Sequence, residues 1–197
     1  MKEKLKLSKK NILIILLLIV IALCSIRGII AYITRTTIAK NIITFGNLKM
    51  QLIETTIAEN NKEIEVDLND EINILENSKL SRLVKVKNLG KHDFFVRISM
   101  NMIGKEKNGE EFDANKFVLY NLNKTDWIYE NGWYYYKKIV KPNEITSNLI
   151  TEIDFDINNI SEKYPSSVFK LDIKAEAVQA ENNAENVLEV LGWPSEK

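Results

Sequence analysis

Beyond residue 40, the chain alternates between apolar and polar side chains with a period of two. In the stretch 94–102, for example, Phe94, Val96 and Ile98 alternate with the polar residues Arg97 and Ser99. Because successive side chains of a β-strand point to opposite faces of a sheet, each such stretch has one buried face and one solvated face. The pattern therefore predicts antiparallel sheets over six residue ranges: 44–52, 63–68, 84–87, 94–102, 149–157 and 169–177.

Turn signals separate these stretches. Residues 88–91 (Asn-Leu-Gly-Lys) and 107–109 (Lys-Asn-Gly) have the composition of short turns. About eight strands at short intervals, without the spacing of βαβ units, favour an all-β fold. We expect residues 32–197 to form an antiparallel two-sheet sandwich of jelly-roll type.

Asn131 and Gly132 form the clearest hairpin signal, because a type I′ turn needs positive φ at both central positions. A two-residue loop there aligns the flanking aromatic residues and places them on two faces. One face carries Trp127, Tyr129, Tyr134 and Tyr136, and the other carries Ile128, Trp133 and Tyr135. Neither face is polar. One face can fill the core, and the other needs a cover or is an interaction surface; Trp127, Tyr129, Tyr134 and Tyr136 are the candidate surface for a partner or a glycan.

The region near residue 190 has a helical pattern. Ala184, Val187, Leu188 and Leu191 follow the i, i+3, i+4, i+7 spacing. Asn182 and Glu185 resemble a capping box, and Gly192 stands where a helix commonly ends. We expect a short C-terminal helix that docks on the sheets, with Trp193 as an anchor.

The N-terminal segment predicts export. Five lysines precede an unbroken apolar run from Ile12 to Cys24, which is the order found in secretory signals. The run is short for a membrane span, which needs about 20 residues. The alternative is a retained anchor: if Arg27 snorkels, residues 12–33 reach spanning length. In both cases the N-terminus lies on the cytoplasmic side.

Several short motifs resemble those of a known family. Residues 28–34 (Gly-Ile-Ile-Ala-Tyr-Ile-Thr) resemble the Gly-Thr-x-Ala-Tyr/Phe-Phe-Thr/Ser junction of proteins exported with a SipW-type signal. Residues 43–50 (Ile-Thr-Phe-Gly-Asn-Leu-Lys-Met) are similar to the Phe-x-x-Gly-x-Leu-x-Leu strand that follows that junction. Later blocks of the chain also resemble exported members of this kind: 86–90, 95–98, 132–138 and 175–180. Together they resemble the TasA/camelysin family of Gram-positive bacteria.

The resemblance implies that the N-terminal segment is cleaved. A SipW-type signal peptidase would remove residues 1–31 by cutting after Ala31, so that Tyr32 begins the mature chain. The family also implies a jelly-roll sandwich and a place at the cell surface or in the matrix, and some members form fibres by donating an N-terminal strand. Ile29 and Arg35 depart from the family pattern, which keeps the retained anchor open.

The sequence offers little for catalysis. Camelysin implies a metallopeptidase, but zinc peptidases generally use two histidines at helical spacing, and this chain has one, His92, at a predicted turn. The one cysteine, Cys24, lies in the N-terminal apolar run. We therefore predict no catalytic residue, no metal ligand and no cofactor. The alternative is a secreted camelysin-like hydrolase.

Acidic residues cluster at two places. Glu152, Asp154 and Asp156 share one face of the predicted strand 149–157, and further acidic residues lie in 67–71. We interpret the first group as a solvated sheet face; a calcium site at either place is the alternative, although the spacing differs from that of an EF-hand. The 27 basic residues equal the 27 acidic ones, so the charge balance gives no support for nucleic-acid binding.

These features predict an exported structural or adhesive protein. After cleavage, residues 32–39 would have no partner strand in their own chain, and a sandwich has open edges. Ile33 and Ile38 of this segment, with Tyr32, could then join a neighbouring copy or another matrix protein. The expected location is outside the cell, or anchored in the membrane if the signal is retained.

Overall fold

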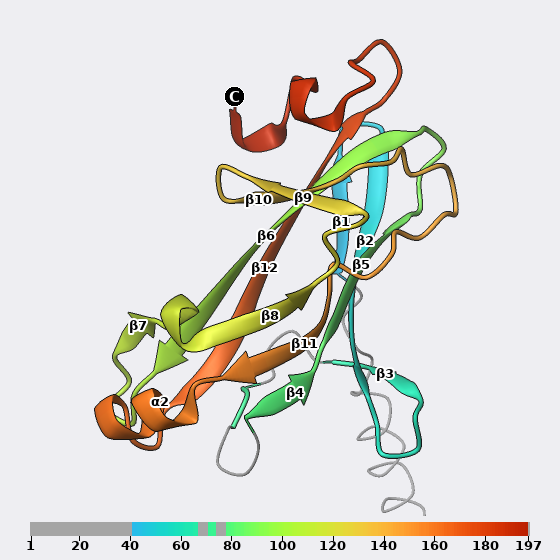
Figure 1. Ribbon diagram of the computed structural model, residues 1–197. Coiled ribbons are helices and arrows are strands. Elements are labelled where there is room, and N and C mark those ends of the chain that lie inside the picture. Colours follow the sequence, from blue (N-terminus) through green and yellow to red (C-terminus); the bar gives the residue numbers. More distant parts are fainter. Residues whose placement is uncertain (1–40, 67–70, 74–77, 197) are drawn as a thin grey trace, which may run out of the picture. The chain divides into compact units, whose positions relative to one another are not determined.

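The computed structural model describes residues 41–66, 71–73 and 78–196. This part of the chain contains twelve β-strands, one α-helix and three short 3-10 helices (Figure 1). All strand pairs in it are antiparallel. The prediction of an antiparallel, all-β fold is confirmed.

The first sheet is built around the long strand β2. Its four strands are β1 (Asn41–Phe45), β2 (Leu48–Ile57), β3 (Glu63–Glu65) and β5 (Leu83–Asn88). β2 pairs with each of the other three. The predicted strand 44–52 is therefore two strands, because a tight turn at Gly46, whose φ is +56°, folds β1 back onto β2.

The second sheet is built around the pair of β6 and β12, which run side by side over twelve residue pairs (Figure 1). β10 pairs with β6, β9 pairs with β10, and β7 pairs with the end of β6. The five strands of this sheet are β6 (Phe94–Lys105), β7 (Glu111–Asp113), β9 (Trp127–Glu130), β10 (Trp133–Tyr136) and β12 (Val168–Gln179).

The third sheet has the order β4-β11-β8. Its strands are β4 (Lys79–Ser81), β8 (Val118–Leu122) and β11 (Ile150–Phe155). Hydrogen bonds continue from this sheet to the first one, since the N–H of Leu149 donates to Val84 O and the N–H of Arg82 donates to Thr151 O. The chain from β4 to β5 thus connects the two sheets.

Side chains from all three sheets meet in one hydrophobic core. The predicted alternation holds there: Val84 and Val86 of β5, and Val96 and Ile98 of β6, are fully buried. Burying one face of each strand is the main source of stability for such a fold, at about 25 cal/mol per Å² of apolar surface. The turns predicted at 88–91 and 107–109 connect β5 to β6 and β6 to β7, as expected.

The α-helix, α2 (Ile157–Lys163), was not predicted from the sequence. The alternation over 149–157 ends at Phe155, because the side chain of Asp156 accepts a hydrogen bond from the N–H of Asn159 and caps the helix. The side chain of Ile160 packs in the hydrophobic core and so attaches the helix to it. Asp156 is therefore a helix cap, and its assignment to the same strand face as Glu152 and Asp154 is wrong.

The predicted C-terminal helix is also wrong. The region contains only the 3-10 helices η2 (Val187–Glu189) and η3 (Pro194–Glu196), in addition to η1 (Asn115–Phe117) earlier in the chain. The Asn183 side chain explains this difference. Its amide accepts from the N–H of Leu191 and donates to Leu191 O, which closes a loop in place of helical hydrogen bonds.

Candidate interaction surface

The β9–β10 hairpin has the predicted geometry. Asn131 and Gly132 have φ values of +49° and +85°, and the strand register joins Trp127 to Tyr136 and Tyr129 to Tyr134. Positive φ at both positions is what a type I′ turn requires. The hairpin therefore carries its aromatic side chains on two faces, which we call the pocket face (Trp127, Tyr129, Tyr134 and Tyr136) and the covered face (Ile128, Trp133 and Tyr135).

The pocket face is only partly exposed. Trp127 and Tyr136 are buried in the main core, where their ring centroids lie 5.0 Å apart. Tyr134 is half-buried, and Tyr129 has 60% of its surface exposed, with its ring centroid 4.8 Å from that of Tyr134. Of the four candidate residues, Tyr129 and Tyr134 thus reach the surface, and the other two support them from below.

A pocket of about 320 Å³ opens beside this face. Trp127, Tyr129 and Tyr134 line it together with Leu122 and Leu149. Its remaining lining comes from Asn123, Lys124, Ile128 and Lys137. Pockets of this size with mostly apolar walls and a few polar groups are typical of small-molecule sites.

The turn between β8 and β9 forms the polar rim of the pocket. The Lys137 ammonium donates to the carbonyl oxygens of Lys124 and Thr125, at 2.9 and 2.7 Å, and so fixes the turn. Asp126 bonds Lys138 at 2.8 Å. That hydrogen bond, together with bonds from Ser147 and Asn123, lowers the pKa of Asp126 to about 2, despite partial desolvation.

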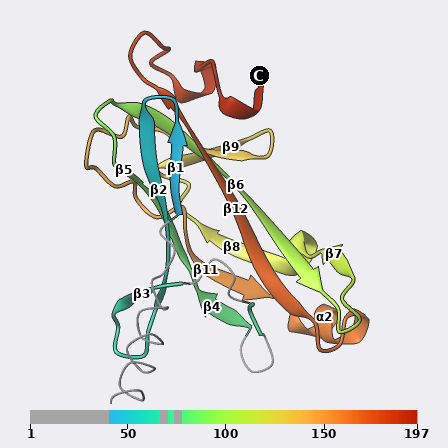
Figure 2. The ribbon, with the colours of Figure 1, turned by 180° about the vertical axis from the view of Figure 1, so that it is seen from behind.

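The covered face lies against the end of the chain. Figures 1 and 2 both show the segment after β12 beside the β9–β10 hairpin, on the second sheet. Val187, Val190 and Trp193 from this segment form a second, smaller core with Phe95 and Tyr135. We call residues 184–196 the cover segment. Trp193 is an anchor, as predicted, although no α-helix carries it.

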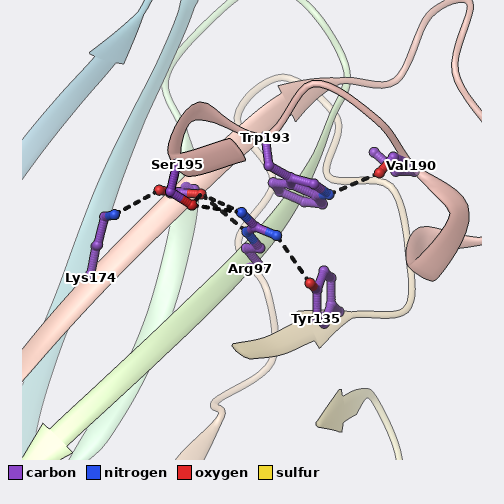
Figure 3. Close-up of polar contacts among 7 residues, drawn as sticks. Arg97, Tyr135, Lys174, Val190, Trp193 and Ser195 are labelled. Atoms are coloured by element: carbon purple, nitrogen blue, oxygen red, sulfur yellow. Dashed lines mark hydrogen bonds and ion pairs between the residues drawn. The ribbon is translucent and has the colours of Figure 1, made fainter. Parts of the chain in front are cut away.

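A buried ion pair lies between the sheet and the cover segment (Figure 3). Arg97 on β6 donates from Nε and Nη2 to Oε2 of Glu176 on β12, at 3.1 and 2.9 Å, and both residues are 1% exposed. Its Nη1 donates to the Tyr135 hydroxyl at 3.0 Å, and its Nη2 donates to Ser195 Oγ at 2.9 Å. The guanidinium therefore connects β6 to β12, to β10 and to the cover segment.

Two tryptophan rings enclose this guanidinium. Its carbon atom lies 4.3 Å from the ring centroid of Trp133 and 4.5 Å from that of Trp193. Cation–π attraction is stronger where water is excluded, as it is here. The Trp193 indole N–H donates to Val190 O at 3.0 Å, so the ring is held in place within the cover segment.

Glu176 is stabilised as a carboxylate. Burial raises its pKa, but hydrogen bonds from Lys174, Arg97 and Ser195 together outweigh burial and hold the pKa below its ordinary value. Lys174 supplies a 2.9 Å contact to the second carboxylate oxygen. Both oxygens of the buried acid thus have cationic partners, which a buried charge needs.

Sequence reasoning missed this cluster. The alternation placed Arg97 and Glu176 on solvated strand faces, and that expectation is wrong because the cover segment shields them. A signal was present in the sequence: Phe95 lies two residues before Arg97 and Val178 two residues after Glu176, so each charge has an apolar neighbour on its own face of the strand. Only the position of the distant cover segment, however, shows that the two charges are buried.

The N-terminal predictions lie outside the described residues. Ala31 and Tyr32 at the expected cleavage site, Ile33 and Ile38 in the expected donor strand, and the apolar segment 12–33 all precede residue 41. Within 41–66, 71–73 and 78–196, no helix is long and apolar enough to cross a membrane.

The acidic groups of the third sheet make ordinary surface contacts. Lys79 lies 3.1 Å from Glu152 and 3.8 Å from Asp154. In the described part of the chain, no group of three or more His, Cys, Asp or Glu side chains is arranged to hold a metal ion. His92 lies exposed in the turn between β5 and β6.

No protein-family model matches the chain, no curated protein matches it, and no solved structure matches it. The resemblance to the TasA/camelysin family therefore stays a prediction from the sequence motifs.

Proposed function

We propose that the protein is an exported structural or adhesive protein of the TasA/camelysin kind, displayed at the cell surface or in the matrix. Its residues 1–31 deliver it, and a SipW-type peptidase cuts after Ala31; if the cut fails, residues 12–33 anchor it. The basic and apolar order of the N-terminal segment supports this proposal.

We propose further that the sheets form a two-layer sandwich of jelly-roll type. The hydrogen bonds that connect β5 to the third sheet support one layer made of the first and third sheets. The single core shared with β6 and β12 supports a second layer opposite to it. An architecture of this kind places short loops at its ends and leaves strand edges at its sides.

Assembly by strand donation rests on the way in which β2 is paired. Leu52 of β2 pairs with Asn41 of β1 on one side and with Val86 of β5 on the other. Thr55 pairs with Glu65 of β3 and with Leu83 of β5. Because β5 occupies one side throughout, β1 and β3 share the opposite side of β2.

The side of β2 beyond β1 is partly occupied. Extending its register backwards places residue 40 opposite Ile53 and residue 39 opposite Glu54. The carbonyl oxygen of Glu54 already accepts a hydrogen bond from the N–H of Val66, at 3.1 Å. The backbone of β2 is therefore already paired at Glu54, which supports the proposal that residues 32–39 pair with another chain. This occupied side of β2 is the observation that carries the proposal.

The first test is the intact mass of the exported protein. We expect the mass of residues 32–197. A mass that includes residues 1–31 contradicts cleavage and favours the anchored form.

The second test is polymer formation by the exported protein as its concentration is raised, measured by light scattering. We expect deletion of residues 32–39 to abolish polymer formation. Ile33→Asp and Ile38→Asp should weaken it because they place a charge in an apolar contact, whereas Thr36→Asp is the matched control at a polar position. Unchanged polymers after the deletion would rule out strand donation.

A further inference from the structure

The pocket beside the hairpin combines exposed aromatic rings with positive charge. Tyr129 and Tyr134 form one wall, with Trp127, Leu122 and Leu149 beneath them. The two tyrosine rings are tilted by 49° to each other, with their centroids 4.8 Å apart. Because Tyr129 is 60% exposed, an apolar face of a ligand can lie on its ring while the other side of the ligand remains in water.

Two lysines give the rim its charge. Lys124 and Lys137 both line the pocket, and both are exposed. Lys137 contacts only backbone carbonyl oxygens, and among the described residues neither lysine has a carboxylate partner. The nearby carboxylate of Asp126 is bonded to Lys138. The rim is therefore suited to an anionic group.

The exposure of Tyr129 favours one of two possible anionic ligands, an aromatic carboxylate or an acidic sugar. An aromatic carboxylate lying on Tyr129 would leave its second apolar face in water, because Tyr129 is 60% exposed. A pyranose ring has apolar C–H groups on one face and hydroxyl groups around its edge. It can cover the tyrosine rings and still keep its hydroxyl groups hydrated.

We propose that this pocket binds an acidic sugar unit of the uronic acid type. The apolar face of the sugar lies on the rings of Tyr129 and Tyr134, and its carboxylate is bound by the ammonium groups of Lys124 and Lys137. The pocket is formed by β8, β9, β10, the turn between β8 and β9, and the residues Lys137 and Leu149, all within one copy of the chain. Binding therefore does not depend on export or on strand donation, so a failure here is distinguishable from a failure of the proposed function.

Isothermal titration calorimetry of the purified full chain tests the proposal with three probes. These are a trigalacturonate, its methyl ester and benzoate. We expect the trigalacturonate to bind at least about tenfold more tightly than the ester, which lacks the charge, and than benzoate, which lacks the sugar face. Added salt should weaken its binding, because the lysines are exposed.

Variants test the residues. Tyr129→Ala and Lys124→Gln should each weaken trigalacturonate binding by about five- to tenfold, whereas Tyr129→Phe keeps the ring and should bind as the parent does. Lys91→Gln, in a turn that does not line the pocket, is the matched charge control. All of these residues are exposed, so the variants should fold.

Four results would overturn the proposal. The first three are equal binding of the acid and the ester, binding of benzoate as tight as that of the trigalacturonate, and loss of affinity in Lys91→Gln equal to that in Lys124→Gln. The fourth is the absence of measurable trigalacturonate binding to the folded parent chain.

Discussion

The two faces of the β9–β10 hairpin have the same kind of side chains but different surroundings. On the pocket face, Trp127 and Tyr136 join the main core and Tyr129 remains open to solvent. On the covered face, Tyr135 and Trp133 lie under the cover segment, around Arg97. The comparison shows that an aromatic pattern in one hairpin does not decide which face is accessible. A segment some fifty residues away in the sequence decides it.

The covered face also has the stricter requirement for hydrogen-bond partners, because it encloses a charge. A charge excluded from water needs a partner for each of its polar atoms, and Arg97 has Glu176, Tyr135 and Ser195. Lys124 and Lys137, at the rim of the pocket, are exposed to water and need no carboxylate partner. Changes to the covered face should therefore affect stability, and changes to the exposed residues around the pocket should affect binding.

The largest effect is expected from Arg97→Ala. This change leaves Glu176 buried with Lys174 and Ser195 only, and removing one partner of a buried ion pair typically costs about 3–5 kcal/mol. Urea unfolding measures the loss. The double variant Arg97→Leu with Glu176→Leu should recover much of it, and a single variant as stable as the parent would contradict the importance of the pair.

Trp193→Ala tests whether the cover segment is held mainly by its anchor. Trp193 packs edge-to-face on Tyr135, at 5.6 Å between ring centroids, and is 2% exposed. We expect a loss of about 3 kcal/mol and faster amide exchange in residues 184–196. Leu191→Ala, at a position 76% exposed, is the control and should change stability by less than about 0.5 kcal/mol. Equal effects of the two changes would contradict the anchor.

Acid should destabilise the covered face. Since the pKa of Glu176 in the folded chain is below its ordinary value of 4.5, its ionisation stabilises the fold above that pH, and this contribution disappears as the pH falls through the lowered pKa. The slope from one such group is at most about 1.4 kcal/mol per pH unit. Near-ultraviolet circular dichroism of the tryptophans measures the change. Glu176→Gln should remove this part of the pH dependence, and an unaltered pH profile in that variant would count against it.

The smallest effect on stability is expected from Tyr129→Ala. Because Tyr129 is 60% exposed, its loss should change the free energy of unfolding by less than about 0.5 kcal/mol. Urea unfolding, run beside Trp127→Ala at the buried base of the same face, measures the contrast. A loss for Tyr129→Ala comparable to that for Trp127→Ala would mean that the pocket face is not open.

The sequence predicted the hairpin well because its signals are local. A two-residue loop fixes the register, so the pairs and faces follow from Asn131 and Gly132 alone. Period-two alternation likewise identified the long strands β6 and β12, although both faces are buried where the cover segment lies on them.

The cover segment could not be predicted in this way. Its apolar spacing was that of a helix, but the Asn183 side chain competes for the backbone groups of Leu191 and closes a loop. The burial of Arg97 depends on where that loop lies, which no local pattern encodes. The same limit applies to the pocket, because Leu149 and Lys124 meet Tyr129 only after the sheets have formed.

The position of Arg97 within the β6–β12 pair also restricts how these strands can align. A shift of two residues keeps every side chain on its original face, so the hydrophobic pattern alone does not oppose it. Such a shift would place Arg97 opposite Lys174 in one direction and opposite Val178 in the other, in place of Glu176. A misaligned ladder would therefore enclose an uncompensated guanidinium, and the ion pair selects the native alignment over its nearest competitors.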